Sequence, residues 1–61
     1  MDKIISELII KYHIRKINDK EISIIVSYKE DLEAIASKYN MKLEESANNA
    51  GGLTVWGKLS I

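Results

Sequence analysis

The spacing of apolar residues along the chain changes at Tyr28, from every second residue before it to about every 3.6 residues after it. Before this point, alternate positions are occupied by Ile22, Ile24, Val26 and Tyr28. This alternation predicts a strand over 22–28 with one apolar face. After it, a stripe at helical spacing consists of Leu32, Ile35, Ala36 and Tyr39. The stripe predicts a helix over 28–40.

Both ends of this helix carry sequence signals. Ser27 and Glu30 have the spacing of a capping box, in which each side chain bonds the backbone N–H of the other residue. Acidic residues follow in the first turn and Lys38 stands in the last, as the helix dipole favours. Asn40 tolerates the left-handed conformation that commonly ends a helix. We therefore expect Ser27 to cap the helix and Asn40 to stop it.

Two later stretches, 41–47 and 53–61, alternate as strands do. In the first stretch, Met41 and Leu43 are expected to face the core. In the second, the inward set is Leu53, Val55, Leu59 and Ile61, and the outward set is Thr54, Trp56, Lys58 and Ser60. Residues 48–52, Asn-Asn-Ala-Gly-Gly, accept positive φ and are typical of a turn. The sequence therefore predicts an antiparallel hairpin at the C-terminus.

The first 17 residues fit two patterns. Residues 4–12 contain a helical stripe, whereas Leu8, Ile10, Tyr12 and Ile14 alternate with Ile9, Lys11, His13 and Arg15 as in a strand. The many β-branched residues favour a strand over 8–17, with residues 2–7 extending it or forming a short helical turn. A three-residue loop at 18–20 would pair Ile14 with Ile24 and Tyr12 with Val26, which places both apolar sets on one face.

These elements predict one small α+β domain, residues 1–61, in the order β-β-α-β-β. Its four-stranded, mainly antiparallel sheet carries one helix packed on one face. The alternative is α-β-α-β-β with residues 2–16 helical. The composition, 46% hydrophobic and 30% charged, is that of a folded protein. A chain of this length buries only about 60% of its unfolded surface, so it needs very good packing or a partner subunit.

Several functional classes are excluded by residues that the sequence lacks. With no Cys and one His, we expect no disulfide, no metal site and no cofactor. We expect no catalytic residues, because His13 has no neighbouring carboxylate and Glu44 and Glu45 point to opposite faces of a strand. The apolar stretch 4–14 is interrupted by charges, which argues against a membrane segment. We therefore expect a cytoplasmic, non-enzymatic protein.

The second face of the predicted sheet is more apolar than a face in water should be. The strand pattern places Ile9, Ile17, Ile25 and Trp56 on it, surrounded by polar and basic residues. An apolar centre with a polar rim is the composition of a protein interface. We therefore expect association with a second copy, as a homodimer, or with another protein. The competing interpretation is that the N-terminal segment folds over this face and makes it an ordinary core.

A second functional hypothesis is a nucleic-acid-binding β-ribbon. Its basic residues would be Lys11, His13, Arg15, Lys16 and Lys20. A two-stranded ribbon fits the major groove and could present such a row to DNA. The chain has zero net charge, however, which is unusual for a protein that binds polyanions. Protein association is therefore the leading hypothesis.

Overall fold

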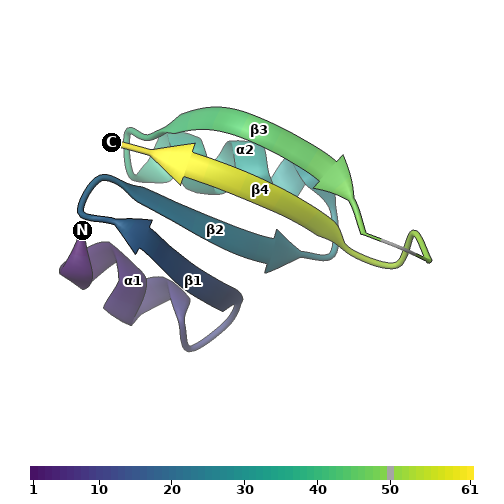
Figure 1. The fold of residues 1–61 in the computed structure, drawn as a ribbon, viewed down its shortest axis with the longest axis horizontal. Coiled ribbons are helices and arrows are strands. Elements are labelled where there is room, and N and C mark those ends of the chain that lie inside the picture. The colour runs from purple at the N-terminus through teal and green to yellow at the C-terminus, as the bar shows by residue number, and fades with distance from the viewer. Residues whose placement is uncertain (50) are drawn as a thin grey trace.

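The computed structural model describes residues 1–49 and 51–61, so Ala50 of the predicted turn lies outside the described residues. The described residues form helices α1 (Asp2–Leu8) and α2 (Lys29–Lys38) and strands β1 (His13–Asn18), β2 (Glu21–Val26), β3 (Lys42–Asn48) and β4 (Val55–Ser60). The strands make one antiparallel sheet in the order β1-β2-β4-β3 (Figure 1). The predicted α+β class and the antiparallel four-stranded sheet are confirmed, with one more helix than expected.

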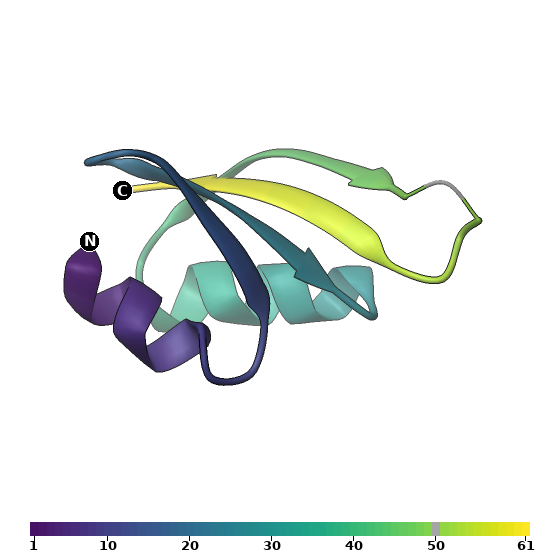
Figure 2. The same ribbon diagram turned by 60° about the horizontal axis from the view of Figure 1, so that its bottom comes forward.

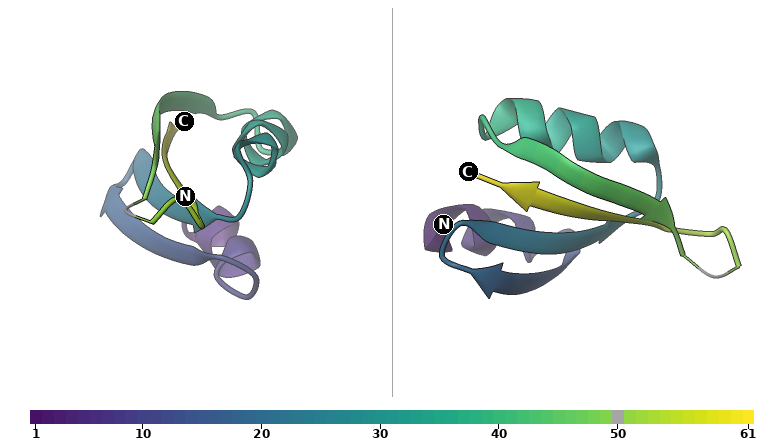
Figure 3. Two further views of the ribbon diagram at one scale, coloured as in Figure 1. Left: turned by 90° about the vertical axis from the view of Figure 1, so that its right-hand side faces the viewer. Right: turned by 45° about the horizontal axis from the view of Figure 1, so that its top comes forward.

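Both helices lie on the same side of the sheet (Figures 2 and 3). The core fills the space between these two layers. Its buried members are Leu8, Ile22, Ile24, Val26, Leu32, Ile35, Ala36, Met41 and Leu59. Burial of such side chains stabilises the fold by about 1.5–3 kcal/mol each before conformational entropy is subtracted.

The N-terminal segment differs from the strand predicted over 8–17. Residues 2–8 form α1, which is the short helical option, and β1 begins only at His13. The backbone N–H groups of Ile9 and Tyr12 still bond the carbonyls of Ile5 and Leu8, at 2.8 Å in each case. As a helix, the segment packs Ile4, Ile5 and Leu8 against the core. This burial outweighs the preference of β-branched residues for strands. The alternative prediction, a helix over residues 2–16, is also wrong, because β1 begins at His13.

The C-terminal end of α2 agrees with the sequence signals, whereas the N-terminal end does not. Along the described chain, no side-chain hydrogen bond caps this helix, and the N-cap residue is Tyr28 rather than Ser27. The predicted capping box is therefore wrong, since the helix begins one residue too late for Ser27 to reach it. Asn40 has the expected left-handed backbone, with φ 54°. The N–H groups of Asn40 and Met41 donate to Ser37 and Ala36, which is a Schellman ending.

Both hairpins form, but each contains an irregularity in its ladder. In the first, Ile14 pairs with Ile24 as predicted, but a bulge between Lys16 and Asn18 lets Asn18 pair with Glu21. The expected three-residue loop is thus a two-residue loop. In the second, a bulge lies between Leu43 and Glu45. Leu53 and Ile61, expected to face inward, lie outside β4 and are 86% and 64% exposed. Tyr28, expected to face inward with β2, is 68% exposed.

Candidate protein interface on the outer face of the sheet

We use the name outer face for the side of the sheet that points away from α1 and α2. None of the described elements covers it (Figure 2). The strand register arranges its residues in rows that cross β1, β2, β4 and β3 in that order. The first row is His13, Ile25, Trp56 and Ala47, and the second row is Arg15, Ser23, Lys58 and Glu45.

The centre of the outer face is apolar. Ile25 and Trp56 are partners on the two inner strands, and both are half-buried by their neighbours on the sheet. Ile17 is 46% exposed at the bulge of β1. A shallow hollow between these groups is lined by Arg15, Lys16, Ile17, Ser23 and Trp56. A large aromatic side chain beside such a hollow is typical of an interface anchor.

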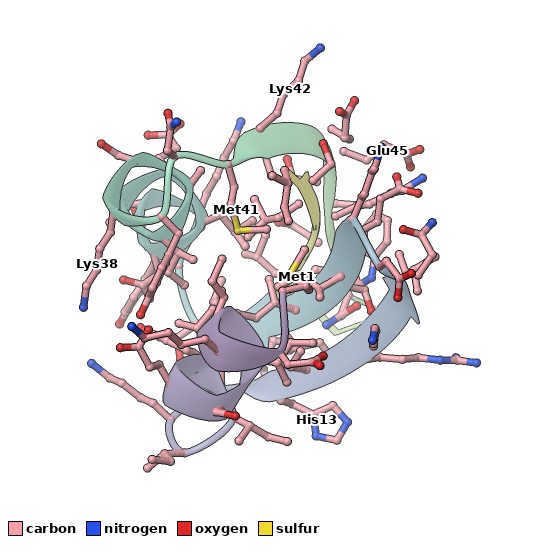
Figure 4. The ribbon with its side chains drawn as sticks, turned by 90° about the vertical axis from the view of Figure 1, so that its left-hand side faces the viewer. Met1, His13, Lys38, Met41, Lys42 and Glu45 are labelled. Atoms are coloured by element: carbon pink, nitrogen blue, oxygen red, sulfur yellow. The ribbon has the colours of Figure 1, made fainter. Side chains whose placement is uncertain are left out.

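The two edges of the outer face carry opposite charges in the second row, where Arg15 lies on β1 and Glu45 lies on β3. At the β1 edge, His13 and Arg15 are exposed, and at the β3 edge Glu45 is exposed. Figure 4 shows the side chains of His13 and Glu45 pointing away from the molecule at these opposite edges of the sheet. Glu44 lies at the bulge of β3 and accepts a hydrogen bond from the Ser60 hydroxyl at 2.7 Å. Lys42 lies on the same edge and the same face, in the row of Ser60, so the β3 edge is mixed in charge and the opposite charges are those of Arg15 and Glu45 in the second row.

One ion pair joins the two inner strands on the outer face, between Lys58 of the second row and Glu21 at the start of β2. Lys58 Nζ lies 3.2 Å from Glu21 Oε2, and the side chains are 28% and 25% exposed. The Asn18 side-chain amide donates to Glu21 Oε1 at 2.7 Å. This hydrogen bond, followed by the contact with Lys58, holds the pKa of the Glu21 carboxyl below its usual value. The charges near the centre of the face are thus already paired within one chain.

Three of the four predicted interface residues lie together on the outer face, namely Ile17, Ile25 and Trp56. Ile9 does not, because it is the C-cap residue of α1 rather than part of a strand, and it is 56% exposed there. The competing interpretation, with the N-terminal segment covering this face, is wrong. That segment forms α1, which lies on the opposite side of the sheet and packs against the core (Figure 2).

The predicted basic ribbon is only partly assembled. His13 and Arg15 lie on the outer face of β1, whereas Lys11 and Lys20 lie in turns outside the strands. Lys16 borders the hollow next to Ile17, but it pairs with Ile22 of the core and its side chain extends to α1 on the opposite side of the sheet. Its Nζ lies 3.3 Å from Asp2 and 3.5 Å from Asp19, and the hydrogen bond and charge of Asp2 are the main causes that raise the pKa of Lys16. The structure therefore does not bring all five basic residues into one row.

The sequence pattern missed the position of Glu45. Simple alternation from Leu43 places Glu45 inward and Ser46 outward, but the bulge at Glu44 reverses this order. Glu45 consequently pairs with Lys58 on the outer face. The sequence gives no signal for this bulge, because none of the residues that form it is a Gly or has a positive φ.

Metal binding and membrane insertion receive no support from the residues that the structure describes. In residues 1–49 and 51–61, no three His, Cys, Asp or Glu side chains form a group that could hold a metal ion. Over the same ranges, neither helix has the length and apolar character needed to span a bilayer. No family model, curated protein or solved structure matches this chain.

Proposed function

We propose that this chain is a non-enzymatic binding module that acts through protein–protein association, as a homodimer joined at its outer face. The observation that carries the proposal is the place of Trp56. It lies beside Ile25 on the inner strands, on a face that the described helices leave open. A sheet face that meets only water is normally polar. Trp at the centre of an apolar patch with a charged rim is instead common in protein interfaces.

The size of the face fits a weak, concentration-dependent dimer. Four strands about 4.8 Å apart, with six or seven residues about 3.3 Å apart, give a face of about 20 Å by 20 Å. Its flat area, about 400 Å², is about half of the 800 Å² that each partner buries in a specific complex of standard size. The whole chain exposes 4281 Å². Dimerisation would thus cover about a tenth of this surface, and it would stabilise the folded chain by mass action.

The test is the mass in solution from micromolar to millimolar concentration, measured by sedimentation equilibrium. We expect a rise from one chain to two, with the Trp56 emission moving to the blue as the dimer forms. Trp56→Ala should weaken association about thirty-fold, as expected for the loss of about 2 kcal/mol at a central Trp. Leu53→Ala is the matched control, because Leu53 is an exposed apolar residue in the loop before β4.

Either of two results would overturn the proposal. The first is a single-chain mass for the wild-type protein at millimolar concentration. The second is an equal effect of Trp56→Ala and Leu53→Ala on the dimer. Nucleic-acid binding is the competing outcome, because His13 and Arg15 are exposed on the same side of β1. It would appear as saturable shifts of their amide resonances with a DNA duplex, lost steeply with added salt.

A further inference from the structure

We infer that the two copies pack their outer faces together about a two-fold axis that runs parallel to the strands. In this arrangement, Trp56 of each copy lies on Ile25 of the other, and Arg15 of each copy faces Glu45 of the other. The inference rests on the proposed self-association and specifies its geometry. It follows from the order of the strands, the register of their residues and the opposite charges of Arg15 and Glu45 at the two ends of the second row.

The apolar contacts follow from the strand order. β2 and β4 are the inner strands, and β1 and β3 are the edges. A two-fold axis between β2 and β4 places β2 of one copy over β4 of the other copy. It likewise places β1 of one copy over β3 of the other copy. Within the first row, Trp56 of β4 then lies over Ile25 of β2 in the second copy, and this contact occurs twice. The outer members of this row, His13 and Ala47, also face each other.

The charged contacts follow from the second row. The same axis places Arg15 of β1 opposite Glu45 of β3 in the second copy, again twice. Lys58 faces Ser23, and it is already paired with Glu21 of its own chain at 3.2 Å. No charge is therefore left unpaired near the centre, where desolvation would be most costly.

A two-fold axis perpendicular to the strands is disfavoured by the same charges. It would place β1 on β1 and β3 on β3. Both Arg15 guanidinium groups would then meet at one edge and both Glu45 carboxylates at the other, which is repulsive. Packed sheets keep their strand directions within about 30°, so the rows of the favoured arrangement still face each other after twisting.

Addition of β1 of one copy to β3 of the next would also join opposite charges. This head-to-tail contact does not close and would build a chain of many copies. The ladder is interrupted by a bulge on each of these strands, between Lys16 and Asn18 and between Leu43 and Glu45. Bulges on edge strands hinder such pairing. The closed, face-to-face dimer also buries Trp56, which edge addition leaves exposed.

The test is a charge exchange between edges. Arg15→Glu alone and Glu45→Arg alone each create two repulsive contacts, and each should weaken self-association on the order of tenfold. An equimolar mixture of the two variants restores both attractions, so it should form a heterodimer as tight as the wild-type dimer. The double variant, Arg15→Glu with Glu45→Arg in one chain, should also dimerise. Sedimentation and native mass spectrometry measure these species.

Matched controls change charge elsewhere. Lys29→Glu and Glu33→Arg make the same changes in net charge on α2, away from the outer face, and should leave the dimer unchanged. Circular dichroism checks that every variant is folded. Dimerisation of the double variant would show that neither substitution disrupts the fold by itself. A mixture no tighter than its components overturns this geometry, although loss of the dimer in Trp56→Ala would still support the proposed function. Assemblies larger than two chains in the mixture would also overturn it, in favour of edge addition.

Discussion

Ile24 and Ile25 are neighbours in β2 and identical in chemistry, yet they belong to two different regions of the molecule. Ile24 is 0% exposed beneath the helices, whereas Ile25 lies on the outer face beside Trp56. Period-two alternation sends adjacent side chains to opposite faces, and α1 and α2 cover only one of them. The comparison teaches that the inner face supplies the core of the single chain. The apolar residues of the outer face are additional to that core.

The largest expected difference between the faces is in the stability of the single chain. Ile24→Ala should lower the free energy of unfolding by about 2–5 kcal/mol, because it leaves a cavity in a packed core. Ile25→Ala should cost less than about 1 kcal/mol in dilute solution, where Ile25 is partly in water. Urea unfolding at low micromolar concentration measures both.

Repeating the urea series at high concentration sharpens this comparison. There, Ile25→Ala should lose the extra stability that dimer formation gives the wild-type chain. Equal losses for Ile24→Ala and Ile25→Ala in dilute solution would show that the two faces do not differ, and the division into core and binding face would be abandoned.

The inner face was predictable because its residues alternate cleanly. Ile22, Ile24 and Val26 all lie in the core, and Ile14 pairs with Ile24 as the apolar pattern required. Asn40 also ended α2 as expected. These features depend on local chemistry and on period two, which a single sequence contains.

The N-terminal segment and the bulges were not predictable in the same way. Residues 8–12 fit both a helix and a strand. The burial of Ile4, Ile5 and Leu8 in the core, which is a tertiary effect, decided between them. Ile9 was misplaced for this reason. The bulge at Glu44 shifts the strand by one residue, so Glu45 joined the candidate site although alternation placed it inside. The sequence therefore predicted the apolar centre of the site but missed its acidic edge.

A smaller difference between the faces is expected when side-chain volume is added. A Cβ on Gly57 would lie 2.5 Å and 2.8 Å from the two Cδ atoms of Leu32, which is 0% exposed. Gly57→Ala should therefore cost about 1–3 kcal/mol by overpacking the core. Ala47→Val enlarges a residue on the outer face and should change stability by less than about 0.5 kcal/mol. Thermal unfolding of both variants in dilute solution makes the comparison, and a harmless Gly57→Ala would show that Leu32 can move freely.

The smallest expected effect concerns the ion pair on the outer face. The pKa of Glu21 is lowered in the folded chain by the hydrogen bond from Asn18 and then by Lys58. Its contribution to stability is therefore present above the unfolded value, near 4.5, and is lost as the pH falls through the lower folded value. Glu21→Gln keeps the shape of the side chain but removes this titration. The difference in Tm between the wild-type chain and Glu21→Gln should be constant above about pH 6 and should shrink on acidification below about pH 4.5.

Because Glu21 is partly exposed and screened by water, this change should be smaller than those of the core variants. A constant difference across that range would mean that Glu21 is not held by Asn18 and Lys58 in solution, and the central charges of the outer face would then be unpaired before any second copy arrives.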